Sequence, residues 1–232
     1  MTTLYIANKN YSSWSLRAWL LMKELAIPFE ERLLPFGDDS AWGPFRALGG
    51  GGKVPTLQQG DLLVWDSLAI VEHLAERHPQ VWPSRTDNRA WARSACAEMH
   101  SGFTTMRDLC SMNIALRVEL TERPADLVRD IERIHQLWLE GLERFGGPFL
   151  AGDRFSAVDA FYAPIVLRFE TYGLCQDTQV QAYMDQIRTL PALEDWCRQA
   201  LAEPWVDPEH EADCVQCGRV LEDHRQGDPV TV

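Results

Sequence analysis

The spacing of apolar residues changes near residue 88, and this change limits the folds that the chain can adopt. Before it, apolar residues form short runs such as residues 4–7 and 29–34, which are typical of buried strands. After it, every long segment has apolar residues three and four positions apart, the pattern of an amphipathic helix. The chain is therefore predicted to fold into a small α/β unit followed by an all-helical one.

The α/β unit is predicted to begin with a strand and a helix. The helix starts near Trp14 and ends at Pro28, because proline cannot continue a helix. Residues 35–52 are rich in glycine and proline and predict a long irregular loop with one helical turn. Two apolar runs, 54–58 and 62–65, flank a polar turn and predict a hairpin that leads into a last helix.

The remaining chain is predicted to divide into a linker, a helical domain and a tail. The prolines of residues 79–87 predict a linker after a first domain of residues 1–78. The helical domain comprises residues 88–205, and residues 206–232 form a polar tail that is either docked or loose. Helices are expected at residues 88–113, 124–145, 156–171, 178–189 and 192–203.

The composition argues against two classes of partner. The formal net charge is −12, whereas a protein that binds nucleic acid needs a basic surface to contact phosphates. No apolar run is long enough to cross a membrane, and the first residues lack the basic start and apolar run of a secretion signal. The six cysteines lie mostly in segments with helical patterns, as in reduced intracellular proteins. We therefore expect a cytoplasmic protein that binds neither nucleic acid nor membranes.

Three short motifs follow one another in a recognisable order. Tyr-Ser-Ser-Trp-Ser-Leu-Arg occupies residues 11–17, between the first strand and the first helix. Gly-Lys-Val-Pro-Thr-Leu, residues 52–57, opens the hairpin, and Asp-Ser-Leu-Ala-Ile, residues 66–70, starts the helix after it. On these motifs, residues 3–205 resemble the cytosolic glutathione S-transferases, in particular a bacterial serine type that is zeta- or theta-like.

This resemblance implies a fold and a co-substrate. The family has a thioredoxin-like N-terminal domain with the order β-α-β-α-β-β-α, followed by a helical-bundle domain. Ser156 and Asp159 match the capping box that opens one helix of that bundle. The family uses glutathione as co-substrate, needs no metal and usually forms homodimers. The second substrate is a small hydrophobic electrophile.

Ser12 and Ser13 immediately precede the first helix and are the predicted catalytic residues. The reactive form of glutathione is the thiolate, but a free thiol has a pKa of about 8.5. A hydroxyl that donates a hydrogen bond to the sulfur favours the anion, and so does the partial positive charge at a helix N-terminus. The resemblance favours Ser12 as the donor, with Ser13 as the second candidate. Either serine could instead only cap the helix.

Residues of the other two motifs are predicted to bind glutathione. The resemblance implies a cis peptide bond between Val54 and Pro55, and the exposed backbone of Val54 could pair with the cysteinyl residue of glutathione. Asp66 and Ser67 lie at a helix N-terminus, which binds carboxylates. Ser67 is expected to bind the γ-glutamyl carboxylate and Asp66 its ammonium group. Lys53 is a candidate for the glycyl carboxylate, and a turn proline with a helix cap is the simpler interpretation of these residues.

The electrophile is expected to lie above the sulfur, between the two domains. Apolar and polarisable side chains suit an electrophile of partly aromatic character. The same side chains could instead belong to the core. The predicted lining residues are Tyr11, Trp14, Met99, Phe103, Met106 and Arg107.

Two further patterns carry less information. The glycine run at residues 49–52 precedes Lys53, but no serine or threonine follows the lysine, so this is not a phosphate-binding loop. Cys214 and Cys217, with His210 nearby, have a spacing compatible with zinc. One such pair in a polar tail is a weak signal, and we predict no metal site.

The sequence thus predicts a glutathione transferase in which a serine activates the thiol. One alternative is a glutathione-dependent isomerase of the maleylacetoacetate type, although Trp14 stands where that subfamily typically has cysteine. Another is a binding protein of this fold without turnover, which we expect to lack the hydroxyl or the carboxylate-binding turn. A thiol-disulfide oxidoreductase would need a cysteine at position 12, because serine cannot form a mixed disulfide.

Overall fold

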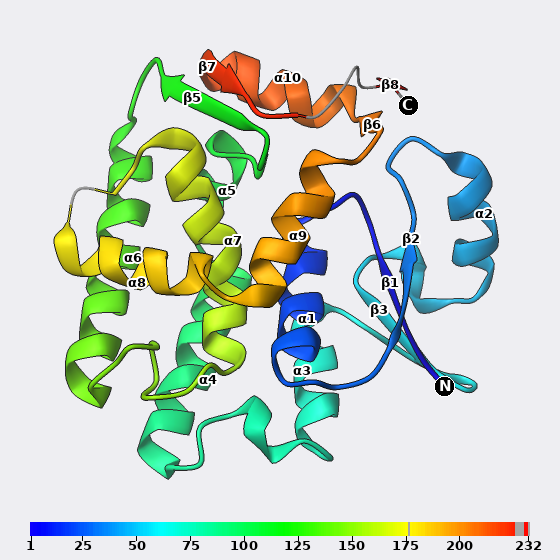
Figure 1. Ribbon diagram of the computed structural model, residues 1–232, viewed down its shortest axis with the longest axis horizontal. Coiled ribbons are helices and arrows are strands. Elements are labelled where there is room, and N and C mark those ends of the chain that lie inside the picture. Colours follow the sequence, from blue (N-terminus) through cyan, green and yellow to red (C-terminus); the bar gives the residue numbers. More distant parts are fainter. Residues whose placement is uncertain (176, 226–229, 232) are drawn as a thin grey trace.

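A mixed four-stranded sheet and a group of helices make up the molecule (Figure 1). The structure is a computed structural model that describes residues 1–175, 177–225 and 230–231. The sheet has the order β2-β1-β3-β4, with β1 parallel to β2 and β3 antiparallel to both of its neighbours. Its strands are β1 (Thr2–Ile6), β2 (Glu30–Leu33), β3 (Thr56–Gln59) and β4 (Leu62–Trp65).

Helices cover the sheet and build the second half of the chain. Three belong to the sheet part: α1 (Ser13–Glu24), α2 (Asp39–Ala47) and α3 (Ser67–Ala75). The helices that follow are α4 (Thr86–Ser101), α5 (Thr104–Leu109), α6 (Ala125–Phe145), α7 (Ala157–Tyr172), α8 (Thr178–Arg188) and α9 (Pro191–Leu201). The predicted fold class is confirmed: a thioredoxin-like sheet with its helices precedes a helical part. The predicted domain boundaries stay predictions.

The segment 35–52 is more ordered than its composition predicted. It contains the full helix α2, where one helical turn was expected. Asp38 caps this helix by accepting hydrogen bonds from the amides of Ser40 and Ala41. Phe45 is buried against the ring of Tyr5, with 5.0 Å between the ring centroids. The cap and this single apolar anchor outweigh the cost of Gly43 and Pro44 within the helix.

The predicted continuous helix at 88–113 is wrong, because the chain breaks at Gly102 and Phe103. The amide of Gly102 still bonds to the carbonyl of Glu98, at 2.8 Å. A Cβ at Gly102 would lie only 2.7 Å from that carbonyl oxygen. Phe103 then takes a left-handed conformation with φ of 54°, and α5 starts in a new direction. Met99 therefore lies on α4, whereas Met106 lies on α5.

The second half is not purely helical, and its C-terminal segment is docked. Strand β5 (Leu116–Leu120) pairs antiparallel with β7 (Gly218–Asp223). Helix α10 (Pro208–Cys217), which immediately precedes β7 in the chain, is drawn in orange-red across the top of Figure 1. Two short strands, β6 (Trp205–Val206) and β8 (Val230–Thr231), pair in parallel. Of the two alternatives for the tail, the docked one is confirmed for the described residues.

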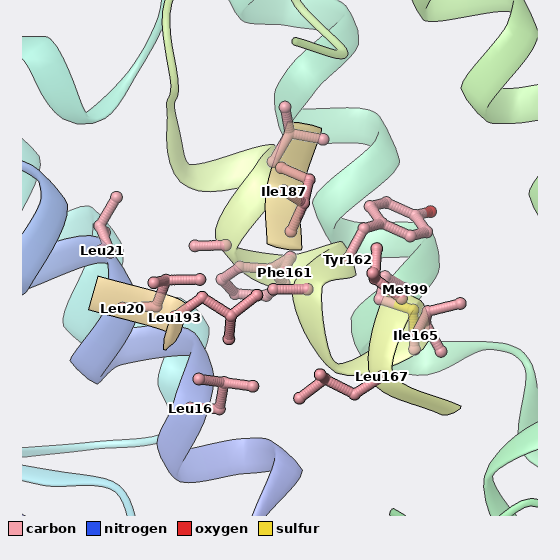
Figure 2. Close-up of a cluster of buried hydrophobic side chains, with 14 of the residues drawn as sticks. Leu16, Leu20, Leu21, Met99, Phe161, Tyr162, Ile165, Leu167, Ile187 and Leu193 are labelled. Atoms are coloured by element: carbon pink, nitrogen blue, oxygen red, sulfur yellow. The ribbon is translucent and has the colours of Figure 1, made fainter. Parts of the chain in front are cut away.

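The core is centred on the contact between α1 and α7 (Figure 2). Leu16 and Leu20 of α1 face the side of α7 that carries Phe161, whereas Ile165 lies beside Met99 of α4, and none of these side chains has exposed surface. Nearly all of α7 is buried. The predicted capping box at its start is confirmed: Asp159 accepts hydrogen bonds from the backbone and the hydroxyl of Ser156.

A buried lysine connects the sheet part to α9. The ammonium group of Lys9 lies 2.5 Å from carboxylate Oε1 of Glu31 on β2 and 2.5 Å from the amide oxygen of Gln199 on α9. It also lies over the rings of Trp19 and Trp196, 5.4 and 5.5 Å from their centroids. Only 2% of the Lys9 side chain is exposed, so this contact holds the two parts in one orientation.

Every helix in the described part of the chain is too short or too polar to cross a bilayer.

Candidate active site

The strand register brings the three sequence motifs to one edge of the sheet. Tyr5 of β1 is opposite Thr56 of β3, and Thr56 is opposite Trp65 of β4. The segment that follows β1, the segment that precedes β3 and the segment that follows β4 therefore meet at that edge. These segments carry the predicted serines, the Lys-Val-Pro element and the Asp-Ser turn.

Ser12 is the N-cap of α1 and belongs to a short chain of hydroxyl contacts. Its Oγ accepts from the amide of Ser15 at 3.4 Å, and its hydroxyl donates to Ser15 Oγ at 2.7 Å. The amide of Ala7, just after β1, also donates to Ser15 Oγ at 3.1 Å. Ser15 thus holds Ser12 at the end of the strand. Only 4% of Ser12 is exposed.

Ser13 has a different partner. Its Oγ accepts a hydrogen bond from Nη2 of Arg168 on α7, at 3.3 Å, and the contact is buried. This bond uses the oxygen of Ser13 and leaves its hydroxyl proton without a partner among the described residues. Both serines lie at the positive end of the α1 dipole. Their roles in activating a thiol stay predictions.

The Val54–Pro55 peptide bond is cis, as the resemblance implied. Lys53 is exposed, and its carbonyl accepts from the Thr56 hydroxyl. Val54 precedes β3, and within the described ranges neither its amide nor its carbonyl has a backbone partner. An extended peptide placed beside Val54 can therefore form hydrogen bonds with its backbone.

The Asp66–Ser67 turn has one satisfied and one unsatisfied side chain. Asp66 takes a positive φ of 75° and caps α3 by accepting from the amides of Leu68 and Ala69, at 2.8 and 3.4 Å. Ser67 is 1% exposed, and its hydroxyl has no partner in the part of the chain that the structure describes. Buried hydroxyls are normally hydrogen-bonded, so Ser67 is suited to bind a polar ligand at the α3 N-terminus.

His100 of α4 reaches this turn from the helical part. Its Nε2 lies 3.3 Å from Oδ2 of Asp66, and its ring contacts Trp14 edge to face at 5.3 Å between centroids. Burial lowers the pKa of the imidazole, and the positive charges of Arg17 and Arg107 act in the same direction, while Asp66 opposes them. No sequence motif indicated His100, because its contact with Asp66 depends on how α3 and α4 pack.

Two buried arginines lie beside the serines. Arg17 is 1% exposed and lies over the rings of Trp14 and Phe161, at 4.2 and 4.9 Å from their centroids. Burial lowers its pKa to about 9, helped by the charges of Arg168 and Arg107. Burial likewise lowers the pKa of Arg168 to about 10. A lone arginine within the apolar run of residues 157–172 was the available signal for Arg168.

The residues predicted to line the acceptor site have unequal exposure. Met99 and Met106 are fully buried, and Phe103 is 7% exposed, so all three lie in the core. Trp14 and Arg107 are only partly buried, and the Arg107 guanidinium lies 5.5 Å from the centroid of the Trp14 ring. Trp14 and Arg107 thus differ from these three core residues in having more exposed surface. The lining role of the full set stays a prediction.

Tyr11 is covered by the C-terminal segment. It is 3% exposed, and its hydroxyl donates to Oε1 of Glu211 on α10 at 2.8 Å. Burial raises the pKa of this phenol, and the Glu211 carboxylate raises it further. His210 of the same helix lies against the Tyr11 ring and also stacks on Phe36, with centroid distances of 5.1 and 5.0 Å.

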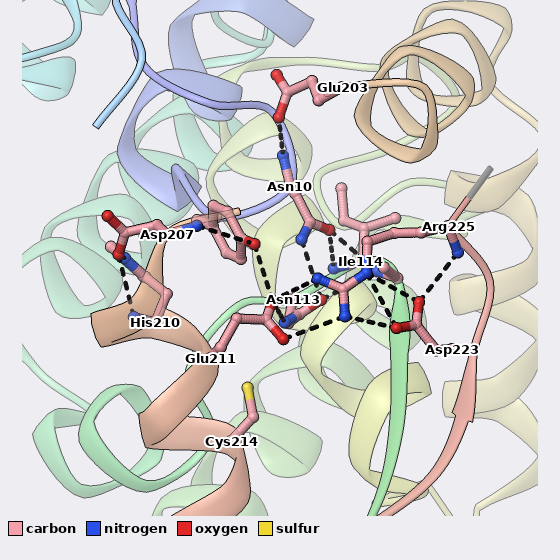
Figure 3. A network of polar contacts seen from close by, with 12 residues as sticks. Asn10, Asn113, Ile114, Glu203, Asp207, His210, Glu211, Cys214, Asp223 and Arg225 are labelled. Atoms are coloured by element: carbon pink, nitrogen blue, oxygen red, sulfur yellow. Dashed lines mark hydrogen bonds and ion pairs between the residues drawn. The ribbon is translucent and has the colours of Figure 1, made fainter. Parts of the chain in front are cut away.

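A polar network fastens the C-terminal segment to the loop before α1 (Figure 3). Asn10 accepts from the amides of Ile114 and Ala115 and donates to Asn113 at 3.1 Å. Asn113 donates to Glu211 at 2.9 Å, and Arg225 pairs with the same carboxylate at 3.0 Å. This network connects α10 to the backbone that leads into the predicted catalytic serines.

The cysteine pair of α10 does not form a metal centre with the described residues. Cys214 is buried and lies 3.3 Å from the hydroxyl of Tyr172, and Cys217 donates to the carbonyl of Cys214. Over residues 1–175 and 177–225, no group of three His, Cys, Asp or Glu side chains is arranged to hold a metal ion.

Comparison with known proteins identifies the relatives of this chain. The family model described as "Glutathione S-transferase, N-terminal domain" matches residues 11–77, and the one described as "Glutathione S-transferase, C-terminal domain" matches residues 89–199. A probable maleylacetoacetate isomerase from Vibrio cholerae is 27% identical over 200 residues, which cover 82% of this chain and 92% of that protein.

Two solved structures illustrate the structural similarity. The theta class glutathione S-transferase from Xanthomonas axonopodis pv. citri, with glutathione bound, is 26% identical, with a TM-score of 0.61 over 84% of this chain and 96% of that one. A glutathione transferase homologue from Burkholderia, also with bound glutathione, is 21% identical, with a TM-score of 0.65 over 86% of this chain and 97% of that one.

Proposed function

The chain belongs to the glutathione S-transferase family, and from this premise we propose that it transfers glutathione to a hydrophobic electrophile after a serine hydroxyl has activated the thiol. The observation that carries the proposal is the buried hydroxyl of Ser67 at the α3 N-terminus, which has no hydrogen-bond partner in residues 1–175, 177–225 and 230–231. It lies at the same sheet edge as the serines that start α1. This arrangement suits a ligand with a carboxylate at one end and a thiol farther along.

Each part of glutathione has a proposed partner. The γ-glutamyl carboxylate accepts from the Ser67 hydroxyl at the positive end of the α3 dipole, and its ammonium group is near Asp66. The cysteinyl backbone pairs with the amide and carbonyl of Val54. Lys53 is a partner for the glycyl carboxylate. The two relatives solved with bound glutathione support the choice of this ligand.

The serine stabilises the thiolate and remains a neutral donor. Reversal of the Ser12–Ser15 hydrogen bond, with Ser15 as donor, frees the Ser12 proton for the sulfur. The α1 dipole adds a favourable potential at the same place. The thiolate then attacks an electrophilic carbon. In a substitution, a sulfur–carbon bond forms and the leaving group departs with its bonding electrons.

A titration of bound glutathione tests the proposal. The ultraviolet absorbance of the thiolate is followed against pH with wild type, Ser12→Ala and Ser13→Ala. We expect wild type to lower the thiol pKa from about 8.5 by one or more units, and Ser12→Ala to lose most of that shift. Ser94→Ala is the matched control, because Ser94 is exposed and bonds only to the Ala90 carbonyl.

Two results would contradict the proposal. If wild-type protein shows no glutathione binding in calorimetry, the proposed binding site is wrong. If the thiol pKa of glutathione bound to wild type stays at its solution value, no hydroxyl activates the thiol. If Ser13→Ala loses more of the pKa shift than Ser12→Ala, Ser13 is the activating residue.

A second candidate function is a glutathione-dependent cis–trans isomerase. It is favoured by the 27% identity to the probable maleylacetoacetate isomerase and by the adjacent serines. Trp14, in place of the cysteine typical of that subfamily, argues against it. An isomerase leaves the glutathione concentration unchanged during turnover, whereas a transferase consumes one glutathione for each product.

We also propose that the protein is a homodimer and acts in the cytoplasm. Homodimers and a cytoplasmic location are usual in this family, and the net charge of −12 is compatible with both proposals. Sedimentation equilibrium that gives the mass of a single chain at all concentrations would contradict the first, and fractionation of cells that express the protein tests the second.

A further inference from the structure

Three guanidinium groups lie near one another beside the proposed thiol site, and none has a carboxylate partner among the described residues. Arg17 and Arg168 are buried, and Arg107 is partly exposed. Ion pairs within 4.0 Å were found for many other arginines of the described residues, but for none of these three. Such a cluster of three arginines is unexpected in a chain with a net charge of −12.

The protein itself satisfies these groups only in part. Nε and Nη1 of Arg17 and Nη1 of Arg168 are buried and have no hydrogen-bond partner among the described residues. Arg107 has one long bond, 3.4 Å, to the His100 carbonyl. Aromatic rings under Arg17 offset some of the desolvation cost, but a buried cation normally has an acidic partner. The lowered pKa values of Arg17 and Arg168 express the same cost.

The acidic group on this side of the site is already engaged. Asp66 faces His100 at 3.3 Å and caps α3 through two amides. Its carboxylate therefore already interacts with the α3 amides and with His100. The arginines remain available to an anion that arrives with a ligand.

A ligand can approach the positive charge of the three arginines at Trp14 and Arg107, which are partly exposed. Trp14 has Arg17 on its ring at 4.2 Å and Arg107 at 5.5 Å, and Arg168 bonds to the adjacent Ser13. A ligand that touches the exposed part of Trp14 therefore meets Arg107 directly and feels the two buried charges beneath it. In this low-dielectric setting the attraction between charges is stronger than in water.

We propose that the second substrate is an anionic electrophile whose carboxylate binds to Arg107, with Arg17 and Arg168 adding positive charge beneath Trp14. This inference rests on the proposed function and narrows it, because hydrophobicity alone no longer describes the electrophile. A guanidinium binds a carboxylate through two parallel hydrogen bonds, which would orient the reactive carbon toward the sulfur.

A matched pair of acceptors tests the inference: 4-oxo-4-phenylbut-2-enoate and its methyl ester. In both, the thiolate forms a sulfur–carbon bond at the alkene, the π electrons move to the carbonyl oxygen as an enolate, and a proton from water adds to carbon. Loss of the enone absorbance gives kcat/KM after subtraction of the uncatalysed rate. We expect wild type to prefer the carboxylate by about tenfold or more, the value of one good ionic contact.

Arg107→Gln is the test variant, because Arg107 is partly exposed and its loss leaves the core intact. We expect the ratio of kcat/KM for acid over ester to fall about tenfold. Arg144→Gln, a change of an exposed arginine at the end of α6, should leave the ratio unchanged. Circular dichroism of each variant checks the fold.

The outcomes separate this inference from the function on which it rests. If wild type conjugates the ester and 1-chloro-2,4-dinitrobenzene but shows no preference for the acid, the inference fails and the transferase function stands. The inference also fails if Arg107→Gln raises the thiol pKa of bound glutathione and leaves the acid-to-ester ratio unchanged, because the charge then serves only the thiolate. If glutathione does not bind, both fail.

Discussion

Ser12, Ser13 and Ser15 are close in sequence but have different environments. Ser15 has no exposed surface and accepts from the Ala7 amide, so it fixes the loop end. Ser12 caps α1 and contacts Ser15, while Ser13 contacts Arg168 of the helical part. Each hydroxyl thus acts through the neighbour that the fold supplies. Equal residue types in one motif need not have equal roles.

Glu203 is expected to make stability depend on pH. Its carboxylate accepts from the amides of Lys9 and Asn10, at 2.6 and 3.3 Å, and burial raises its pKa from 4.5 to about 7. The folded state therefore binds a proton that the unfolded state has lost between these pH values. The free energy of unfolding must fall as pH rises through this range.

Glu203→Gln should remove this dependence. We expect the free energy of unfolding of the variant, relative to wild type, to rise by about 2 kcal/mol between pH 5 and pH 8, since one pKa unit corresponds to about 1.4 kcal/mol. Urea titrations at the two pH values measure it. Glu209→Gln, at an exposed position of α10, is the control. Parallel pH profiles of wild type and Glu203→Gln would contradict the assignment.

The docking of β7 on β5 depends on the absence of a side chain at Gly218. A Cβ there would lie 2.3 Å from the carbonyl oxygen of Glu119 on the paired strand. Backbone atoms cannot move aside cheaply, so the two strands must separate or shift. The β5–β7 pairing holds α10 over Tyr11. Loss of this pairing would loosen the C-terminal segment that covers Tyr11.

Gly218→Ala should therefore release the C-terminal segment without unfolding the rest. We expect faster hydrogen exchange over residues 205–225 and faster proteolysis there, with little change in the core around α7. Gly43→Ala is the matched control, because a Cβ at Gly43 meets no atom within 4 Å and alanine favours a helix. Unchanged exchange in the segment would show that β5–β7 pairing tolerates the added methyl.

Polar contacts between the two parts of the molecule add to the apolar contact of α1 with α7. Lys9 connects β2 and α9 across the contact between the parts, and Glu203 holds the backbone of the same loop. The apolar contact of α1 with α7 is the most extensive helix contact between the two parts. The polar contacts fix the orientation, and therefore the distance between the serines and the arginines of the helical part.

Lys9→Ala should destabilise the whole protein. We expect a loss of about 2 kcal/mol in the free energy of unfolding, below the usual cost of breaking a fully buried pair because 28% of the Glu31 side chain is exposed. Guanidinium denaturation followed by tryptophan fluorescence measures it. Arg129→Ala removes an exposed pair with Asp126 and should cost less than about 1 kcal/mol; an equal loss in both variants would contradict the buried contact.

Local patterns determined much of this protein. The first helix, the hairpin, the capping box at Ser156 and the helical second half follow from apolar spacing, turns and caps, which act over a few residues. The motifs also predicted which residues bind glutathione, and this stays a prediction, whereas the cis bond before Pro55, implied by the family resemblance, is confirmed. Helix α2 was underestimated because one buried ring, Phe45, outweighed its glycine and proline.

Only the tertiary structure decided the remaining features. The pairing of β5 with β7 and the network of Asn113, Glu211 and Arg225 join segments that are distant in the chain. Arg17 and Arg168 have no carboxylate partner among the described residues, and this too depends on the packing of α7 against its neighbours. Burial and long-range pairing depend on all elements packing together. Local patterns therefore predicted the fold class, while packing decided which charged groups lie near the predicted site and which segment covers it.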